Sequence, residues 1–121
     1  MMDSSTSRHR PDASGPLQGV RVLEVSRSHG FYCGKLFADM GADVVLVEPP
    51  GDGVGLRGVP PFIDDRGDRE SGIPHFYFNT NKRSVTLDLD RDEGRALFRR
   101  LVANADLVLE DAAPGVMRER G

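Results

Sequence analysis

Residues 20–48 read VRVLEVSRSHGFYCGKLFADMGADVVLVE, and this stretch decides the fold. It begins with the run 20–25, whose β-branched residues are typical of a strand, and passes through the polar turn 26–30. A helical pattern occupies residues 31–40. The run 43–48 is nearly all apolar, as expected for a strand of a parallel sheet that is covered on both faces. The stretch therefore predicts a β-α-β unit.

The predicted helix has one apolar side. Tyr32, Leu36 and Met40 recur at helical spacing. Cys33 lies on the same side, so we expect a small buried hydrophobic residue there and not a nucleophile. Gly41 is expected to end the helix, because glycine tolerates the left-handed conformation past the last turn.

A second unit of strand, helix and strand follows a long connection. Residues 49–74 are rich in Gly and Pro, and a connection of that length is usually functional or disordered. Residues 84–89 alternate as a strand does, and residues 107–110 form another apolar strand. The order of elements predicts an α/β fold, a Rossmann-like, open and mainly parallel sheet with helices on its faces.

The helix between these two strands is predicted to begin at Asp90. Asp90 can cap the free backbone N–H groups, and Glu93 stands three residues on, as a capping box requires. One side of the helix is apolar and should face the sheet. Its apolar residues are Leu97, Phe98, Leu101 and Val102.

Composition excludes several classes of protein. The 121 residues carry a net charge of −3, which argues against nonspecific binding of nucleic acid. No apolar run approaches the roughly 18 residues that span a bilayer, so no membrane association is expected. Residues 1–15 lack the apolar core of a secretory signal and predict a disordered leader, which leaves 16–121 as the α/β segment. Cys33 is the only cysteine, which fits a reducing cytoplasm.

Three short motifs suggest ligands but lack the context that those ligands require. Residues 53–58, GVGLRG, match the dinucleotide fingerprint, yet they neither follow a strand directly nor open a helix. Residues 88–92 begin like a calcium loop, but Glu93 and Arg99 replace its glycine and its last glutamate. The three histidines have no partner at metal-ligand spacing, so no metal site is predicted.

Two features place charge or a hydrogen-bond donor near a possible ligand. Open α/β sheets bind ligands outside the carboxyl ends of their strands, and His29 lies in the turn after the first strand. His29 could donate to a phosphate or a thioester, or it could be an exposed turn residue. Lys82 and Arg83 precede a strand and could hold a phosphate or a carboxylate, although most such pairs are only solvated.

Four blocks of the chain follow one another in a recognisable order. They are PLQGVRVLE at 16–24, ADMGADVVLVEPPG at 38–51, NKRSVTLDL at 81–89 and PGVM at 114–117. In this order the blocks resemble the N-terminal region of the class III CoA-transferases, the CaiB/BaiF family, which also contains the α-methylacyl-CoA racemases. The resemblance implies an enzyme that moves coenzyme A between carboxylic acids.

The resemblance also implies what the chain lacks. Family members are several times longer, and their catalytic aspartate follows the matched region, so we assign no catalytic residue here and expect the chain alone to be inactive. CoA or an acyl-CoA would be a substrate and not a permanently bound cofactor, with a carboxylic acid as the acceptor. The alternatives are a non-catalytic CoA- or nucleotide-binding module or remnant, and a fragment of an acyl-CoA racemase. An NAD-dependent enzyme would rest only on the misplaced glycine motif.

Part of the CoA site is implied within this chain. Ser28 and His29 match a turn that touches CoA, and Pro49 matches a strand end where many members have an arginine near the phosphates. The residues that match the adenosine-lining strand end are Leu87, Asp88, Leu89 and Asp90. The residues that stand where the family commonly shows Asn-Phe-Arg are Asp111, Ala112 and Ala113.

The chain departs from the family pattern in ways that remove positive charge. The turn 27–31 is one residue shorter than usual and lacks a proline, and 111–113 lose an aromatic ring and a cation. Glu119 stands where an arginine is common, with Arg120 one place later. Because charge-assisted contacts to a polyphosphate are the strong ones, we expect weak affinity for CoA.

The resemblance also implies an intertwined homodimer, because family members pair as two ring-like chains that pass through each other. The expected partner is therefore a second copy of the full-length chain, or a separate C-terminal chain. A piece of 121 residues cannot form such a ring, so surfaces meant for the missing chain would be exposed and poor solubility is predicted.

Overall fold

The computed structural model describes residues 14–121, so nearly all of the predicted leader lies outside the described residues. Four strands form one sheet in the order β3-β2-β1-β4, and every neighbouring pair is parallel. The α/β fold with a parallel sheet is therefore confirmed. The strands are β1 (Arg21–Val25), β2 (Asp43–Glu48), β3 (Arg83–Thr86) and β4 (Leu107–Glu110).

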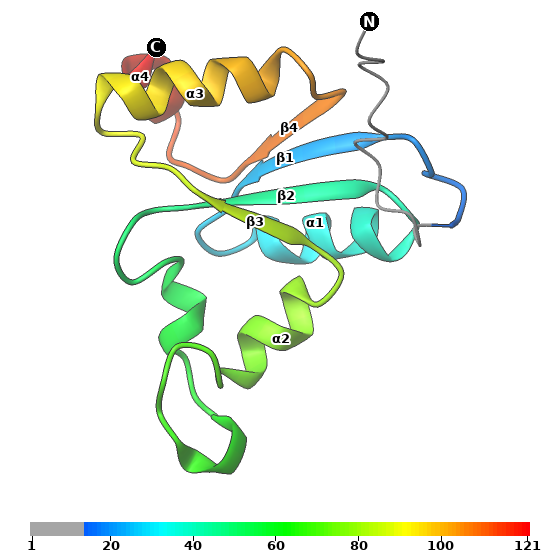
Figure 1. Cartoon of the computed structure of the whole chain (residues 1–121), viewed down its shortest axis with the longest axis vertical. Coiled ribbons are helices and arrows are strands. Elements are labelled where there is room, and N and C mark those ends of the chain that lie inside the picture. Colours follow the sequence, from blue (N-terminus) through cyan, green and yellow to red (C-terminus); the bar gives the residue numbers. More distant parts are fainter. Residues whose placement is uncertain (1–13) are drawn as a thin grey trace, which may run out of the picture.

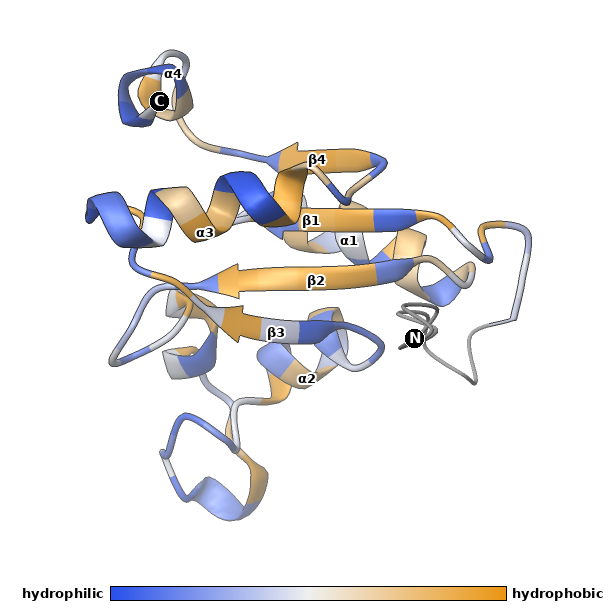
Figure 2. Ribbon diagram, turned by 45° about the horizontal axis from the view of Figure 1, so that its top comes forward, coloured by the Kyte–Doolittle hydropathy of each residue, from blue (hydrophilic) through white to orange (hydrophobic). Residues whose placement is uncertain are grey.

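Helices lie on both faces of the sheet (Figure 1). Successive residues of a strand point to opposite faces, so in β1 Val22 packs with Ala38 of the first helix while Leu23 joins the cluster that Phe98 of the third helix covers. Figure 2 shows hydrophobic residues along β1 and β2, as befits strands with two covered faces. The helices are α1 (Gly30–Asp39), α2 (Ile73–Asn79), α3 (Asp92–Val102) and α4 (Val116–Arg120).

Helix α1 buries a different side from the one predicted. Its buried residues include Phe31, Gly34 and Ala38, whereas Tyr32 is 51% exposed and Cys33 is also exposed. The prediction that Cys33 is a buried hydrophobic residue is therefore wrong. The small residues decide the orientation, because a Cβ at position 34 would overlap the carboxylate of Glu24 in β1. Gly41 does follow the helix with a φ of +98°, as predicted.

The start of α3 was also mispredicted. The N-cap residue is Arg91 and no side chain caps the helix, so neither Asp90 nor Glu93 forms the predicted capping box. Strand β3 ends at Thr86, three residues earlier than predicted. The chain then bends so that the buried Leu87 and Leu89 join the core under α3. Of the predicted apolar stripe, Phe98 and Val102 pack on this core, while Leu97 and Leu101 are exposed.

The connection after β2 is more ordered than the sequence indicated. It contains the 3-10 turns η1 (Gly55–Gly58) and η2 (Ile63–Asp65), and α2 begins at Ile73. Arg57 fixes it to the sheet through two hydrogen bonds to Glu48, from Nε to Oε2 at 2.7 Å and from Nη2 to Oε1 at 2.8 Å. This bidentate geometry is the strongest form of an ion pair between arginine and a carboxylate. It holds the connection beside the carboxyl end of β2.

Candidate functional site

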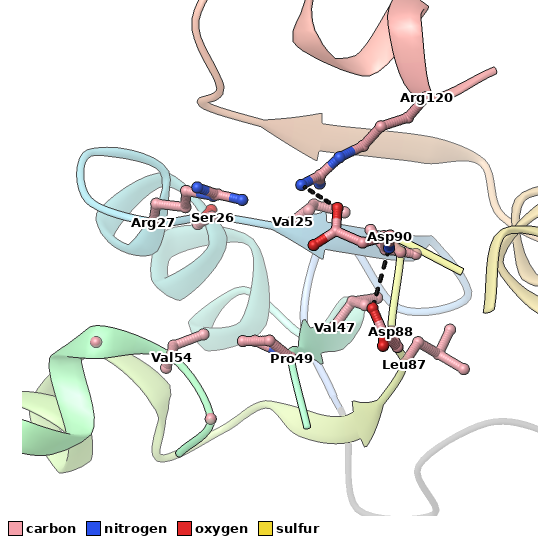
Figure 3. A pocket seen from close by; sticks show the side chains of 13 residues that line it. Val25, Ser26, Arg27, Val47, Pro49, Val54, Leu87, Asp88, Asp90 and Arg120 are labelled. Atoms are coloured by element: carbon pink, nitrogen blue, oxygen red, sulfur yellow. Dashed lines mark hydrogen bonds and ion pairs between the residues drawn. The ribbon is translucent and has the colours of Figure 1, made fainter. Parts of the chain in front are cut away.

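A cavity of about 390 Å³ opens at the carboxyl ends of β1, β2 and β3 (Figure 3). This is the edge at which open α/β sheets bind ligands. Its apolar walls are Val25, Val47, Val54, Leu87 and Leu89. Its polar and small lining residues are Ser26, Arg27, Pro49, Gly53, Gly55, Asp88, Asp90 and Arg120.

Half of the predicted site residues lie together in this cavity. Pro49 comes from the end of β2, and the other four come from the bend after β3. The predicted residues that line the cavity are Pro49, Leu87, Asp88, Leu89 and Asp90. Those that lie outside its lining are Ser28, His29, Asp111, Ala112 and Ala113.

The turn between β1 and α1 already holds a carboxylate. Asp111 accepts hydrogen bonds from the backbone N–H groups of Arg27 at 2.7 Å, Ser28 at 2.8 Å and Gly30 at 2.9 Å. Partial burial acts to raise the pKa of Asp111, but these amide bonds outweigh it and hold the pKa below its ordinary value. Asp111 thus occupies the amides that an anion would seek at the start of a helix. The exposed His29 lies at the N-cap of α1, outside the cavity lining.

Two arginines that we did not predict as site residues line the cavity. Arg27 follows β1, and Arg120 reaches the cavity from α4, where its Nη2 lies 3.0 Å from Oδ1 of Asp90 (Figure 3). The sequence offered one signal for Arg120, its place one residue after the position where the resemblance leads us to expect an arginine. Nothing local distinguishes Arg27 from the other arginines of the chain.

The basic pair after α2 holds protein carboxylates. Nζ of Lys82 lies 2.7 Å from Oε2 of Glu24 and donates to the carbonyl oxygen of Phe31 at 2.9 Å. Arg83 donates to both carboxylate oxygens of Asp43, at 2.8 and 2.6 Å. Both side chains are thus engaged by carboxylates of the chain itself, and the binding of a ligand phosphate or carboxylate by this pair stays a prediction.

Burial opposes the ionisation of both Glu24 and Lys82. The side chains of Glu24 and Lys82 are 0% and 1% exposed. Burial raises the pKa of Glu24 and lowers that of Lys82, and the attraction between them opposes both changes. The pair ties β1 to the first turn of α1 and so holds the turn that borders the cavity.

The glycine-rich motif contributes to the cavity without forming a dinucleotide fingerprint. Gly53 and Gly55 line the cavity, and Gly53 adopts a φ of +68° that favours glycine. Glu48 accepts a hydrogen bond from the backbone N–H of Val54 at 3.0 Å, which brings this segment against the strand end. The following residues form a 3-10 turn and not a helix, in agreement with the sequence context.

Within residues 14–121, no group of three or more His, Cys, Asp or Glu residues could hold a metal ion. In the same range, no helix combines the length and the apolar character that a membrane crossing needs.

Comparison with known proteins gives a consistent set of matches. The model of CoA-transferase family III matches residues 17–121. The chain is 46% identical over 107 residues to a succinyl-CoA:mesaconate CoA-transferase of Haloarcula hispanica, covering 87% of this chain and 26% of that protein. It is 45% identical over 105 residues to a succinate–glutarate CoA-transferase of Agrobacterium fabrum, covering 84% of this chain and 26% of that enzyme.

Solved structures agree with the sequence matches. A CaiB/BaiF family protein from Brucella suis superposes with a TM-score of 0.77 at 42% identity, covering 88% of this chain and 28% of that one. The chain therefore spans about a quarter of the length of the curated relatives it matches, at 26% of each.

Proposed function

This chain belongs to CoA-transferase family III, and we propose that it supplies part of the CoA site of an enzyme that moves coenzyme A from an acyl-CoA to a carboxylate. The observation that carries the proposal is the cavity at the carboxyl ends of β1, β2 and β3. Its volume of about 390 Å³ lies within the range of roughly 300–1,000 Å³ that is common for small-molecule sites.

The lining of the cavity suits the two ends of a nucleotide. The aliphatic side chains of Val25, Val47 and Leu87 form an apolar wall of the cavity, against which a nucleobase can pack. Arg27 and Arg120 stand at the polar rim, and a guanidinium binds phosphate oxygens through charge-assisted hydrogen bonds. We therefore place the adenosine of CoA against the valines and its phosphates toward the arginines.

The transfer itself needs a nucleophile that we assign to polypeptide beyond this chain. An aspartate oxygen attacks the thioester carbon, the C–S bond breaks and CoA leaves as the thiolate, which gives a mixed anhydride. The thiolate then attacks the aspartyl carbonyl of this anhydride, so that the donor acid leaves as its carboxylate and an aspartyl-CoA thioester remains. The acceptor carboxylate attacks that thioester and expels the thiolate, which finally attacks the acceptor carbonyl of the second anhydride, gives the CoA thioester of the acceptor and frees the aspartate. The role of this chain is to bind the nucleotide and to orient the thioester. Holding the thioester in position makes its reaction with the nucleophile effectively unimolecular, which lowers the entropic part of the barrier. The remainder of the site would come from the same polypeptide or from a partner copy.

The names of the relatives suggest the first substrate to assay. Two of the similar enzymes, from Haloarcula hispanica and Chloroflexus aurantiacus, are named for succinyl-CoA as the donor, and each is named for a different organic acid as the acceptor. We propose succinyl-CoA as the donor, and mesaconate and glutarate as the first acceptors to compare.

Calorimetric titration of the chain with CoA tests the proposal. We expect 1:1 binding of CoA, no binding of NAD, and weaker binding of CoA by Arg27→Gln. Arg66→Gln is the matched control, because Arg66 is exposed in the connection after β2 and pairs with Asp68. Equal binding of NAD and CoA would favour a general nucleotide module, and equal loss in both variants would mean that the cavity is not the site.

A further inference from the structure

The cation that faces the cavity from α4 is already engaged. Nη2 of Arg120 lies 3.0 Å from Oδ1 of Asp90, and both residues line the cavity (Figure 3). The two side chains differ in exposure, at 22% for Arg120 and 81% for Asp90. The pair therefore joins a partly covered arginine to a carboxylate that faces solvent at the mouth of the cavity.

Both partners are held in place by their own surroundings. The backbone N–H of Asp90 donates to Oδ1 of Asp88 at 3.0 Å, which fixes the bend after β3. Arg120 also lines a smaller cavity between α3 and α4, together with Phe98 and Met117. Covering the stem of an arginine in this way limits the directions in which its charged end can point. The contact is thus a feature of the packed chain.

The charges around the cavity create a competition. Its cations are Arg27 and Arg120 and its carboxylates are Asp88 and Asp90. Within residues 14–121, the guanidinium of Arg27 has no ion pair, whereas that of Arg120 is paired with Asp90. A phosphate that binds the paired face of Arg120 must displace this carboxylate, because two negative charges at contact distance repel each other.

We propose that Asp90 is a built-in competitor that holds Arg120 across the mouth of the cavity, so that ligand phosphate binds Arg120 only by displacing the Asp90 carboxylate. This inference rests on the proposed function, because CoA supplies the phosphates. Exposed ion pairs are weak, so the competition changes the dissociation constant of CoA by about two- to five-fold. It makes Asp90 a determinant of affinity that an isosteric change can release.

A double-mutant cycle tests the competition. The variants are D90N, R120Q and D90N/R120Q, and D92N is the control, because Asp92 is exposed near Asp90, carries the same charge and pairs with Arg95. We expect D90N to tighten CoA binding by about two- to five-fold at low salt, and R120Q to weaken it. In the R120Q background the gain from D90N should fall to the level of D92N, because no arginine remains to be released.

The outcomes separate this inference from the proposed function. If D90N gives the same gain with and without Arg120, Asp90 acts by general repulsion and the competition is overturned, while CoA binding stands. If no variant binds CoA, both ideas fail.

A ligand-free readout tests the contact itself. The Nε–H resonance of Arg120 should shift in D90N and stay in place in D92N. An unmoved resonance in both variants would mean that the two side chains do not interact in solution.

Discussion

Replacing Lys82 by methionine should destabilise the chain strongly and make its stability depend on pH. The substitution keeps the length of the side chain but leaves the carboxylate of Glu24, which is 0% exposed, without the ammonium that lies 2.7 Å away. Removing one partner of a buried ion pair costs about 3–5 kcal/mol. A domain of this size has about 5–15 kcal/mol of stability in total, so a large fraction should be lost at pH 7.

The direction of the pH effect follows from the protonation of Glu24. Burial already raises the pKa of Glu24 above its ordinary value of 4.5, and removing Lys82 takes away an interaction that lowers it. A folded state with a raised carboxyl pKa binds more protons than the unfolded chain. Its stability is therefore greatest below the unfolded pKa and falls as pH rises toward the folded pKa, by about 1.4 kcal/mol per pH unit. Lys82→Met should thus be least harmful near pH 4.

Urea unfolding followed by circular dichroism measures this effect at pH 4, 5, 6 and 7. Lys35→Met is the matched control, since Lys35 pairs with Asp39 at the surface and its loss should leave the unfolding free energy little changed. The double variant Glu24→Leu/Lys82→Met should recover most of the loss, because a buried ion pair can be replaced by apolar residues. A Lys82→Met variant that stays within about 1 kcal/mol of the original chain at pH 7 would refute the reasoning.

Three further predictions concern other positions. Gly34→Ala should lower the unfolding free energy by about 1–3 kcal/mol, because the new Cβ would overlap the carboxylate of Glu24. Gly55→Ala is the control and should have a much smaller effect, since no atom lies within 4 Å of its new Cβ. Thermal unfolding compares the two variants. Asp111→Ala should lower the unfolding free energy by about 1–3 kcal/mol, because it leaves backbone amides unpaired. Since folding lowers the pKa of Asp111, its contribution is present above the ordinary pKa of 3.8 and is lost as pH falls through the folded pKa. Urea unfolding across about pH 2–7 measures this loss. Leu36→Lys on the outer side of α1, where Leu36 is 43% exposed, should reduce self-association in sedimentation experiments without loss of stability, and an unchanged sedimentation profile would contradict an aggregating role for this side.

The sheet was predictable because its information is local. Strands β1 and β2 are dense in Val and Leu, and a strand covered on both faces must read as a nearly continuous apolar run. The buried side of α1 was not predictable from the same kind of pattern. Tyr32, Leu36 and Met40 form the more apolar stripe, but Gly34 and Ala38 allow the closer approach to the sheet. The close approach of α1 to the sheet decided its orientation over hydrophobicity, because only a residue without a Cβ fits at position 34 beside the buried carboxylate of Glu24.

Only part of the lining of the cavity was predictable, and that part came from the resemblance to a family. Residues 87–90 were expected at a strand end of the CoA site by resemblance, and they do line the cavity, although they form a bend after β3 and not the end of a strand. Arg120 was missed as a site residue because its role depends on where α4 lies relative to β3, which no local pattern encodes. The pairing of Glu24 with Lys82 was missed for the same reason, since 58 positions separate them in the chain.

The positions of two carboxylates limit where the phosphates of the proposed CoA ligand can bind. Asp111 fills the backbone amides at the start of α1, so a phosphate gains nothing from that helix end while Asp111 is ionised. The remaining positive groups of the cavity are the side chains of Arg27 and Arg120. Only Arg120 is paired with a carboxylate, that of Asp90, and must give up this pair before it binds a phosphate. Phosphate binding in this chain should therefore depend on flexible guanidinium groups and not on fixed amides. Its affinity should fall steeply with salt, because partly exposed charges are screened over about 10 Å at 0.1 M ionic strength.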